Sequence, residues 1–147
     1  MTAKDFMRSP AITIDREATL REAIALLSSH RISGLPVVDD QGDLVGIVTE
    51  HDIIKGMLPT YEDIISADAS FLDPGLMQSR IYQVRDNAVS SIMTTNVVAL
   101  EEDASLLKAA STVILKKVRW LPVVRNGKPV GIVSRIDIMQ ALMQGGS

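Results

Sequence analysis

The sequence contains no cysteine among its 147 residues, which excludes disulfide bonds, thiolate zinc sites and cysteine nucleophiles. Aromatic side chains make up only 3% of the chain, so aliphatic side chains must form the core. The uninterrupted apolar runs are far shorter than the roughly 18 residues that cross a bilayer. The N-terminus has no apolar stretch of secretory length either. We therefore expect a cytoplasmic protein with no membrane partner.

A strong excess of either charge is also missing, since 15 basic residues stand against 18 acidic ones. A net charge of −3 lacks the broad positive surface of proteins that bind duplex nucleic acid, so we expect no such partner. The length fits one compact domain or two small halves that share a core, which excludes a large multidomain enzyme.

Motifs for catalysis and metal binding are missing as well. The two histidines, His30 and His51, have no close ligand spacing, so we expect no metal site. The sequence has no GxxxxGK[ST] loop to hold a phosphate and no GxSxG nucleophile turn. We therefore predict that the protein is not an enzyme, has no catalytic residues and carries no covalently bound cofactor.

What the chain does contain is a repeat at an interval of 85 or 86 residues. Leu35–Val38 and Val45–Thr49, followed by Asp52, reappear as Leu121–Val124 and Val130–Ser134, followed by Asp137. The turns between the paired segments contain Gln41-Gly42 and Asn126-Gly127, and Asn-Gly is a strong hairpin signal. Each copy therefore predicts two strands joined by a turn, with a helix after Thr49 or Ser134.

An amphipathic helix is predicted ahead of each hairpin. Thr19 and Glu22 have the spacing of a capping box, and Ser105 takes the cap position in the second copy. Apolar residues then recur at helical spacing. They are Leu20, Ala23, Ile24 and Leu27 in the first copy and Leu106, Ala109, Ala110, Val113 and Ile114 in the second. A short extended segment precedes each helix, at Ala11–Ile14 and Asn96–Leu100.

These patterns divide the chain into a first repeat at residues 1–58, a helical insertion at 59–88 and a second repeat at 89–147. One copy alone would bury too little surface to be comfortably stable, so the two copies should pack on each other. Within the insertion, residues 60–72 and, more weakly, 76–85 have helical patterns. The insertion either lies on the core or forms an arm that binds a partner or a second copy.

A hydroxyl and a carboxylate three residues apart open each final helix, as Thr49 with Asp52 and Ser134 with Asp137. One interpretation is helix capping, because these residue types satisfy free backbone N–H groups and suit the helix dipole. The other is a nucleotide site, in which the helix start receives phosphate and the carboxylate accepts hydrogen bonds from two ribose hydroxyls. Spacing does not separate the two, because one Asp can serve both purposes.

The two copies resemble the CBS domain, named for cystathionine beta-synthase, arranged as a tandem pair. The resemblance rests on Ile32–Val38 with Gly46–Thr49 and Asp52, and on Val118–Val124 with Gly131–Ser134 and Asp137. It implies an α/β fold of two β-α-β-β-α repeats packed as a pseudo-twofold pair, with the helical insertion between them. Such pairs bind AMP, ADP, ATP, S-adenosylmethionine and sometimes NAD in clefts between the copies, and they commonly dimerise.

The resemblance also implies roles for single residues. Asp52 and Asp137 would hold ribose, with Thr49 and Ser134 beside them near phosphate. Backbone around Thr13-Ile14 and Ala99-Leu100 would border the base, and Pro36 and Pro122 would shape an apolar wall.

The two clefts should differ in charge. Residues 113–135 contain six basic side chains and no acidic one, whereas the matching part of the first copy is mostly acidic. Phosphate should therefore prefer the surroundings of Lys116, Lys117 and especially Arg135, beside Ser134. The alternative is that these are solvated surface charges.

We therefore predict a regulatory module that reversibly binds an adenosine-containing ligand and signals adenine-nucleotide levels to a separate effector protein. The ligand would be an adenine nucleotide or S-adenosylmethionine, and the protein a homodimer. One alternative is a ligand-free dimerisation or assembly module, in which the Asp residues only cap helices. Another is a small enzyme acting on a nucleotide.

Overall fold

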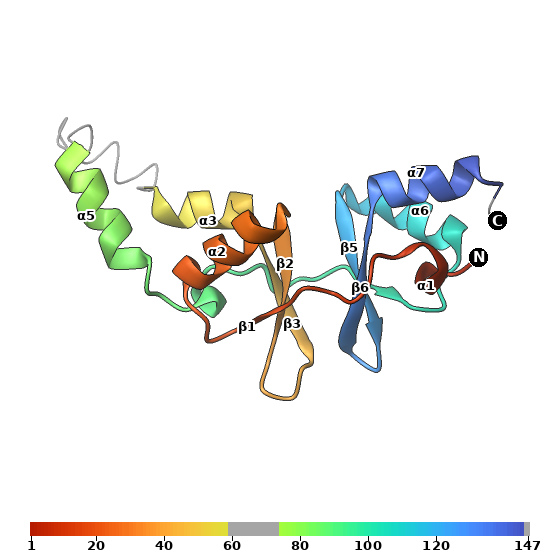
Figure 1. Ribbon diagram of the computed structural model, residues 1–147, viewed down its shortest axis with the longest axis horizontal. Helices are drawn as coiled ribbons and strands as arrows, with labels where there is room; N and C mark the ends of the chain where they lie inside the picture. The colour runs from red at the N-terminus through yellow and green to blue at the C-terminus, as the bar shows by residue number, and fades with distance from the viewer. Residues whose placement is uncertain (59–73, 146–147) are drawn as a thin grey trace. The chain divides into compact units, whose positions relative to one another are not determined.

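The computed structural model describes residues 1–58 and 74–145 (Figure 1). It confirms an α/β fold with two three-stranded sheets, ordered β1-β2-β3 and β4-β5-β6. The chain divides into two compact units. The first repeat unit comprises Ile14–Val37 and Gly46–Thr95, and the second repeat unit comprises Met1–Thr13, Val38–Val45 and the chain from Asn96 onwards. In the described part of the chain, no helix is long and apolar enough to cross a bilayer.

The first sheet and its helices follow the predicted order. The elements are β1 (Ile14–Asp15), α2 (Leu20–His30), β2 (Gly34–Val38), β3 (Leu44–Thr49), α3 (Glu50–Met57), α5 (Pro74–Val84) and the 3-10 helix η2 (Val89–Ser91). The predicted capping box of α2 is confirmed, because the Thr19 hydroxyl accepts from the Glu22 N–H at 3.2 Å and the Glu22 carboxylate accepts from the Thr19 N–H at 3.0 Å.

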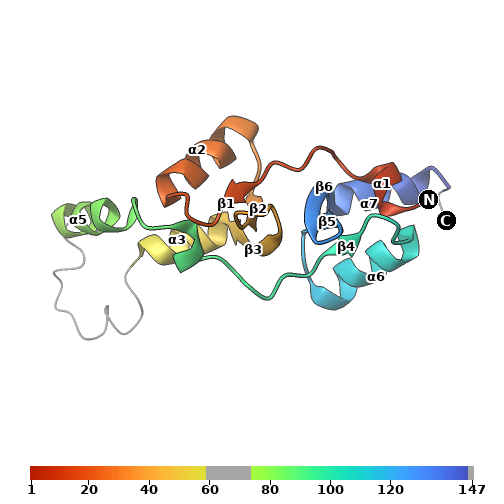
Figure 2. The same ribbon diagram turned by 90° about the horizontal axis from the view of Figure 1, so that it is seen from below.

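The insertion is described only in its second half. The helix predicted at residues 60–72 lies outside the described residues, whereas α5 confirms the weaker helical pattern at 76–85. Helix α5 contacts α3 of the same unit, and both views show the two helices next to each other (Figures 1 and 2).

The second sheet is built in the same way. Its elements are α1 (Ala3–Phe6), β4 (Leu100–Glu101), α6 (Leu106–Lys116), β5 (Trp120–Arg125), β6 (Lys128–Ser134) and α7 (Arg135–Met143). Strand β5 runs parallel to β4 and antiparallel to β6. Helices α6 and α7 lie side by side (Figure 2) and cover a core of small and branched aliphatic side chains. That core contains Ala3, Leu100, Leu106, Ala109, Leu121, Val123, Val133, Ile138 and Ala141.

Three details depart from the sequence-based expectations. The extended segments before α2 and α6 form strand only at their ends, since β1 begins at Ile14 and β4 at Leu100. Asn126 and Gly127 both have positive φ, at 51° and 79°, as the predicted two-residue turn requires, whereas Gln41-Gly42 belongs to a longer loop in which only Gly42 has positive φ. Ile24 and Ile114 belong to the predicted apolar stripes but are 40% and 74% exposed.

A short segment flanks the last strand of each sheet, which the sequence patterns did not predict. Arg8 and Ile132 exchange backbone hydrogen bonds of 2.8 and 2.9 Å beside β6. Thr94 and Ile47 exchange bonds of 2.8 and 2.9 Å beside β3. The first of these segments lies at the start of the predicted first repeat (residues 1–58), yet it belongs to the second repeat unit. Both segments cover strand edges that would otherwise expose unpaired backbone groups.

The segment beside β6 begins with α1, whose start is capped from within. The Thr2 backbone N–H donates to Asp5 at 2.7 Å. This bond lowers the pKa of the Asp5 carboxyl below its usual value of 3.8, because it favours the charged form. Asp5 therefore stays ionised near neutral pH and holds the first turn of α1.

Candidate functional site

Asp137 lies at the start of α7, where β6 ends. Its Oδ2 accepts hydrogen bonds from the backbone N–H and the hydroxyl of Ser134, both at 2.8 Å. The Ser134 hydroxyl in turn accepts from the Asp137 N–H at 3.4 Å. Asp137 is 7% exposed. Among the residues that the structure describes, no other charged side chain is buried. A buried carboxylate is costly unless donors surround it, so the site must supply them.

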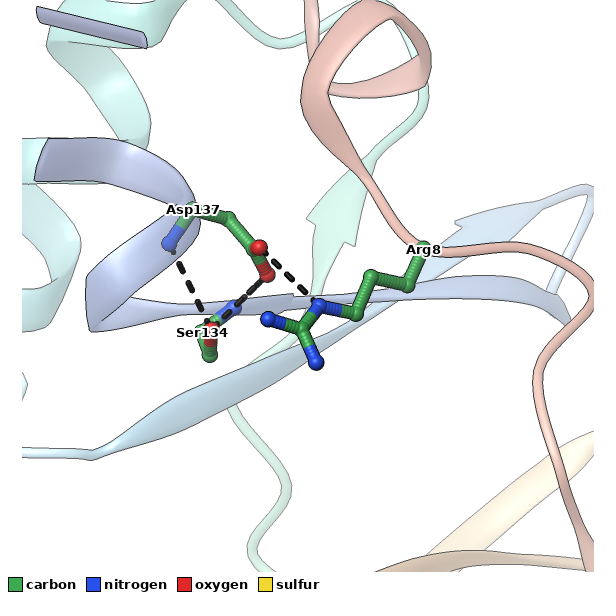
Figure 3. Close-up of polar contacts among 3 residues, drawn as sticks. All are labelled: Arg8, Ser134 and Asp137. Atoms are coloured by element: carbon green, nitrogen blue, oxygen red, sulfur yellow. Dashed lines mark hydrogen bonds and ion pairs between the residues drawn. The ribbon is translucent and has the colours of Figure 1, made fainter. Parts of the chain in front are cut away.

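The remaining donor to Asp137 comes from the opposite end of the chain (Figure 3). Arg8 Nε lies 3.0 Å from Asp137 Oδ1 and forms an ion pair with it. The Arg8 side chain is 69% exposed, whereas that of Asp137 is 8% exposed. The carboxylate therefore lies below the surface, and its counter-charge lies at the surface, where a ligand in solution can reach it.

Asp52 has the matching position at the start of α3, where β3 ends. Its Oδ2 accepts from the Thr49 N–H at 3.0 Å and from the Thr49 hydroxyl at 3.1 Å. The Thr94 hydroxyl lies 3.3 and 3.4 Å from the two carboxylate oxygens. Thr94 therefore contacts Asp52 as Arg8 contacts Asp137, but without a positive charge.

The sequence analysis missed both Arg8 and Thr94, although a signal for them exists. They are 86 residues apart, the same interval that separates Pro36 from Pro122. Each follows a methionine, Met7 or Met93, that packs against a glycine of the neighbouring strand. Extending the repeat search to the segments in front of each copy would have placed the two residues in equivalent positions.

The capping interpretation is confirmed at both helices, since Thr49 with Asp52 and Ser134 with Asp137 form complete capping boxes. The first helical N–H groups are also occupied, because Glu50 donates to the Ser33 carbonyl at 2.9 Å and Arg135 to the Arg119 carbonyl at 3.1 Å. A phosphate at either helix start would compete with these bonds. Capping does not exclude a ligand role, because each carboxylate keeps further acceptor capacity.

The predicted basic cluster is only partly assembled. Lys117 and Arg135 line a groove of about 420 Å³ between α6 and α7, whereas Ser134 and Asp137 do not line it. Arg135 Nε donates to the Val118 carbonyl at 3.2 Å. Lys116 is exposed at the end of α6. The groove is otherwise apolar, with Ala110, Val113, Ile114, Ile138, Met139 and Leu142 as its other lining residues.

The residues predicted to surround the base are mostly packed inside the units. Pro36 and Pro122 are fully buried, and Ile14 is buried at the start of β1. Thr13, which precedes β1, is half-buried. Their predicted contacts with a ligand stay predictions. Across residues 1–58 and 74–145, no group of three or more His, Asp or Glu side chains is placed to hold a metal ion.

Curated relatives match almost the whole chain. A CBS domain-containing protein of Dictyostelium discoideum is 32% identical, over 96% of this chain and 90% of its own length. An uncharacterized protein of Methanocaldococcus jannaschii is also 32% identical, over 97% of this chain and 92% of its own length.

Solved structures share the fold. The CBS domain of a CBS domain-containing membrane protein from Sphaerobacter thermophilus has a TM-score of 0.77 and 31% identity, covering 95% of this chain and 86% of its own. CBSX2 in complex with AMP has a TM-score of 0.72 and 28% identity, covering 97% and 96%. The CBS domain pair of protein MJ0100, in complex with 5′-methylthioadenosine and S-adenosyl-L-methionine, has a TM-score of 0.71 and 29% identity, covering 99% and 97%.

The family model of the CBS domain matches residues 3–59 and 89–144. Both matches include the segment in front of the repeat, with α1 in one case and η2 in the other. They also include Asp52 and Asp137, each in its own copy. The chain therefore belongs to the CBS domain family, as a tandem CBS domain protein.

Proposed function

We propose that the protein is a regulatory module that reversibly binds an adenosine-containing ligand through Asp52 and Asp137. The observation that carries the proposal is the duplicated carboxylate, held in the same geometry at the start of the helix after each sheet. Two structural relatives support it, because one was solved with AMP and another with 5′-methylthioadenosine and S-adenosyl-L-methionine. AMP, ADP, ATP, S-adenosylmethionine and NAD are the candidate ligands.

The carboxylates have the chemistry that ribose recognition needs. An ionised carboxylate has about four acceptor positions, and a pair of vicinal hydroxyls occupies two of them. Ser134 and Arg8 together donate three bonds to Asp137. About one position is therefore left, so a ribose that binds through both hydroxyls must displace one existing donor.

The remaining predicted contacts form part of the same proposal. Thr49 and Ser134 would lie near phosphate, with Lys116, Lys117 and Arg135 as additional cations for it. Binding would favour one arrangement of the protein over another, to the extent that the ligand binds the two with different affinity. A separate effector protein would respond to that change. The cytoplasmic location of the protein stays a prediction.

We also propose that two copies of the chain associate. Helices α6 and α7 expose several large apolar side chains: Leu107, Ile114, Leu115, Ile136, Met139, Leu142 and Met143. Three of them, Ile114, Met139 and Leu142, line the same groove, and an exposed apolar groove of this kind is typical of protein interfaces.

The second candidate is a ligand-free assembly module, which one observation favours. Both carboxylates already have partners within their own unit, so capping alone accounts for their positions. The apolar surface of α6 and α7 would then be the functional part of the protein.

Thermal denaturation with the five candidate ligands separates the two functions. A ligand at about 100 times its Kd stabilises the folded protein by roughly 2.7 kcal/mol, which raises the Tm measurably. We expect at least one of the five to do so. If none changes the Tm at millimolar concentration, the assembly module is the better description, and release of a product would instead identify an enzyme.

Replacement of the carboxylate tests its role directly. Asp137→Ala should weaken binding of that ligand by about 1.5 to 3 kcal/mol, because charged hydrogen bonds are lost, as isothermal titration calorimetry would measure. Asp5→Ala is the matched control, since Asp5 also caps a helix of this unit and should leave the affinity unchanged. An unchanged affinity in Asp137→Ala, with a lower Tm, would show that Asp137 is a cap only.

A further inference from the structure

We infer that Arg8 makes Asp137 select adenosine ligands that carry a phosphate, whereas Thr94 makes Asp52 select ligands that carry none. The inference rests on the proposed function, because it assigns specificity to the same two carboxylates. The two sites would differ in the charge of one neighbouring side chain, Arg8 or Thr94, which lies in front of the repeated strands and helices.

The contacts of Arg8 leave most of its hydrogen-bonding capacity unused. A guanidinium has five N–H donors. Within the described residues, the Arg8 side chain forms one hydrogen bond, from Nε to Asp137. The side chain is 69% exposed, and the pairing of Arg8 with Ile132 holds its backbone next to β6. The backbone is therefore fixed while the charged end can exchange one anionic partner for another.

When Arg8 leaves Asp137, a phosphate group is the anionic partner that suits it best. A ribose that binds Asp137 through both hydroxyls must displace a donor, and Arg8 is the exposed one. A neutral nucleoside would leave the displaced guanidinium without an anionic partner. A nucleotide supplies a phosphate, to which a guanidinium can donate two parallel hydrogen bonds. The specificity therefore comes from the cost imposed on the neutral ligand as well as from the new contact with the phosphate.

At Asp52, no charged donor has to be displaced when ribose binds. The Thr94 hydroxyl is uncharged, and its distances of 3.3 and 3.4 Å to the carboxylate exceed those of a good O–H···O hydrogen bond. A ribose can displace it without separating an ion pair. Among the residues that the structure describes, Asp52 forms no ion pair, and its partners are the uncharged Thr49 and Thr94. No paired cation is therefore released to meet a phosphate, so a neutral nucleoside or a cationic sulfonium compound binds there more favourably.

The test compares AMP with adenosine, which differ by the phosphate alone. Both are titrated by calorimetry into the full chain carrying Asp52→Asn, which isolates Asp137, with and without Arg8→Thr. Thr94 shows that a threonine at this position keeps the backbone pairing. Arg8→Thr should reduce the preference for AMP over adenosine by about tenfold to a hundredfold, since a charged hydrogen-bond donor is lost. Arg125→Thr is the matched control, because it removes an equal charge from an ion pair with Glu102 elsewhere in the unit.

The outcomes distinguish this inference from the proposed function. An unchanged AMP preference in Arg8→Thr overturns the inference and leaves the proposed function intact. An equal loss of AMP and adenosine affinity overturns it as well, because Arg8 would then only position Asp137. If the chain with Arg8 intact binds neither compound, the proposed function fails at Asp137. Circular dichroism of each variant shows whether it has folded.

The reciprocal variant tests the role of Thr94 at the Asp52 site. Thr94→Arg, in a chain carrying Asp137→Asn, should raise the preference of the remaining Asp52 site for AMP over adenosine by about tenfold. A preference that stays at its original value would show that the charge at this position does not set the specificity.

Discussion

Two residues that end helices have a backbone conformation that suits glycine better. Arg31 follows α2 with φ 53° and ψ 47°, and Lys117 follows α6 with φ 55° and ψ 39°. This left-handed conformation costs roughly 1 to 2 kcal/mol for a residue with a Cβ atom. The two positions are 86 residues apart, so both copies end the helix ahead of their hairpin in the same strained way.

Replacement by glycine should therefore stabilise the protein. Lys117→Gly is expected to raise the free energy of unfolding by about 0.5 to 1 kcal/mol, because the relief of strain exceeds the entropy that glycine adds to the unfolded chain. Urea denaturation measures this change. Lys116→Gly is the matched control: Lys116 is the last residue of α6, where the backbone is still helical and glycine should not raise the free energy of unfolding. Equal effects of the two variants would contradict the explanation.

At the scale of single residues, the sequence predicts contacts that are close along the chain. The capping pairs Thr19 with Glu22, Thr49 with Asp52 and Ser134 with Asp137 all span three residues, and local backbone geometry alone brings them together. The ion pair of Arg8 with Asp137 spans 129 residues. It depends on which strand the N-terminal segment lies beside, and no local pattern contains that information.

At the scale of elements, a glycine allows each flanking segment to approach its strand. A Cβ atom on Gly46 would lie 2.7 Å from Met93 Sδ and 2.9 Å from the Thr94 carbonyl oxygen. A Cβ atom on Gly131 would overlap Met7 Sδ and lie 3.0 Å from the Arg8 carbonyl oxygen. The repeated glycine is therefore a packing requirement of both segments, in addition to its place in the strand.

Gly131→Ala should displace the N-terminal segment from β6. We expect a loss of about 1 to 3 kcal/mol in the free energy of unfolding, as for other overpacked sites, with faster hydrogen exchange at the Arg8 and Ile132 amides. A double-mutant cycle with Met7→Ala provides the control, because removing the methionine should make the alanine less destabilising. Strictly additive effects would mean that the segment does not press on Gly131.

The order of elements was predictable, whereas the pairing of the flanking segments was not. Strands β2, β3, β5 and β6 contain apolar residues between turn signals, so their positions followed from periodicity and turn chemistry. Helix α1 has four residues and η2 has three, which is too short for a helical period to show. The two-residue strands β1 and β4 are equally short, which is why their bounds were misplaced.

At the scale of the whole molecule, the exposed side chains of α6 and α7 bear on the oligomeric state. Ile114, at 74% exposure, belongs to a stripe whose spacing predicts burial, and Met139 and Leu142 are about half exposed beside it. A second copy would remove this apolar surface from water, and its burial favours association by roughly 25 cal/mol per Å².

Sedimentation equilibrium should therefore give twice the 16.0 kDa of one chain. Met139→Glu places a charge on the apolar surface and should shift the protein towards the monomer, because an unpaired charge is costly to bury. Gln140→Glu is the matched control, as the next residue of α7, also exposed and given the same charge. A monomeric wild-type chain at tens of micromolar, or equal behaviour of the two variants, would contradict the proposed homodimer.

The placement of the N-terminal segment has a mechanical consequence. Residues 3–8 contact β6 and α7, and Arg8 pairs with Ile132, so displacing this segment from β6 also moves Arg8 away from Asp137. Detaching the segment would remove the counter-charge of Asp137, whereas the described contacts of Asp52 come from Thr49 and Thr94 and do not involve this segment.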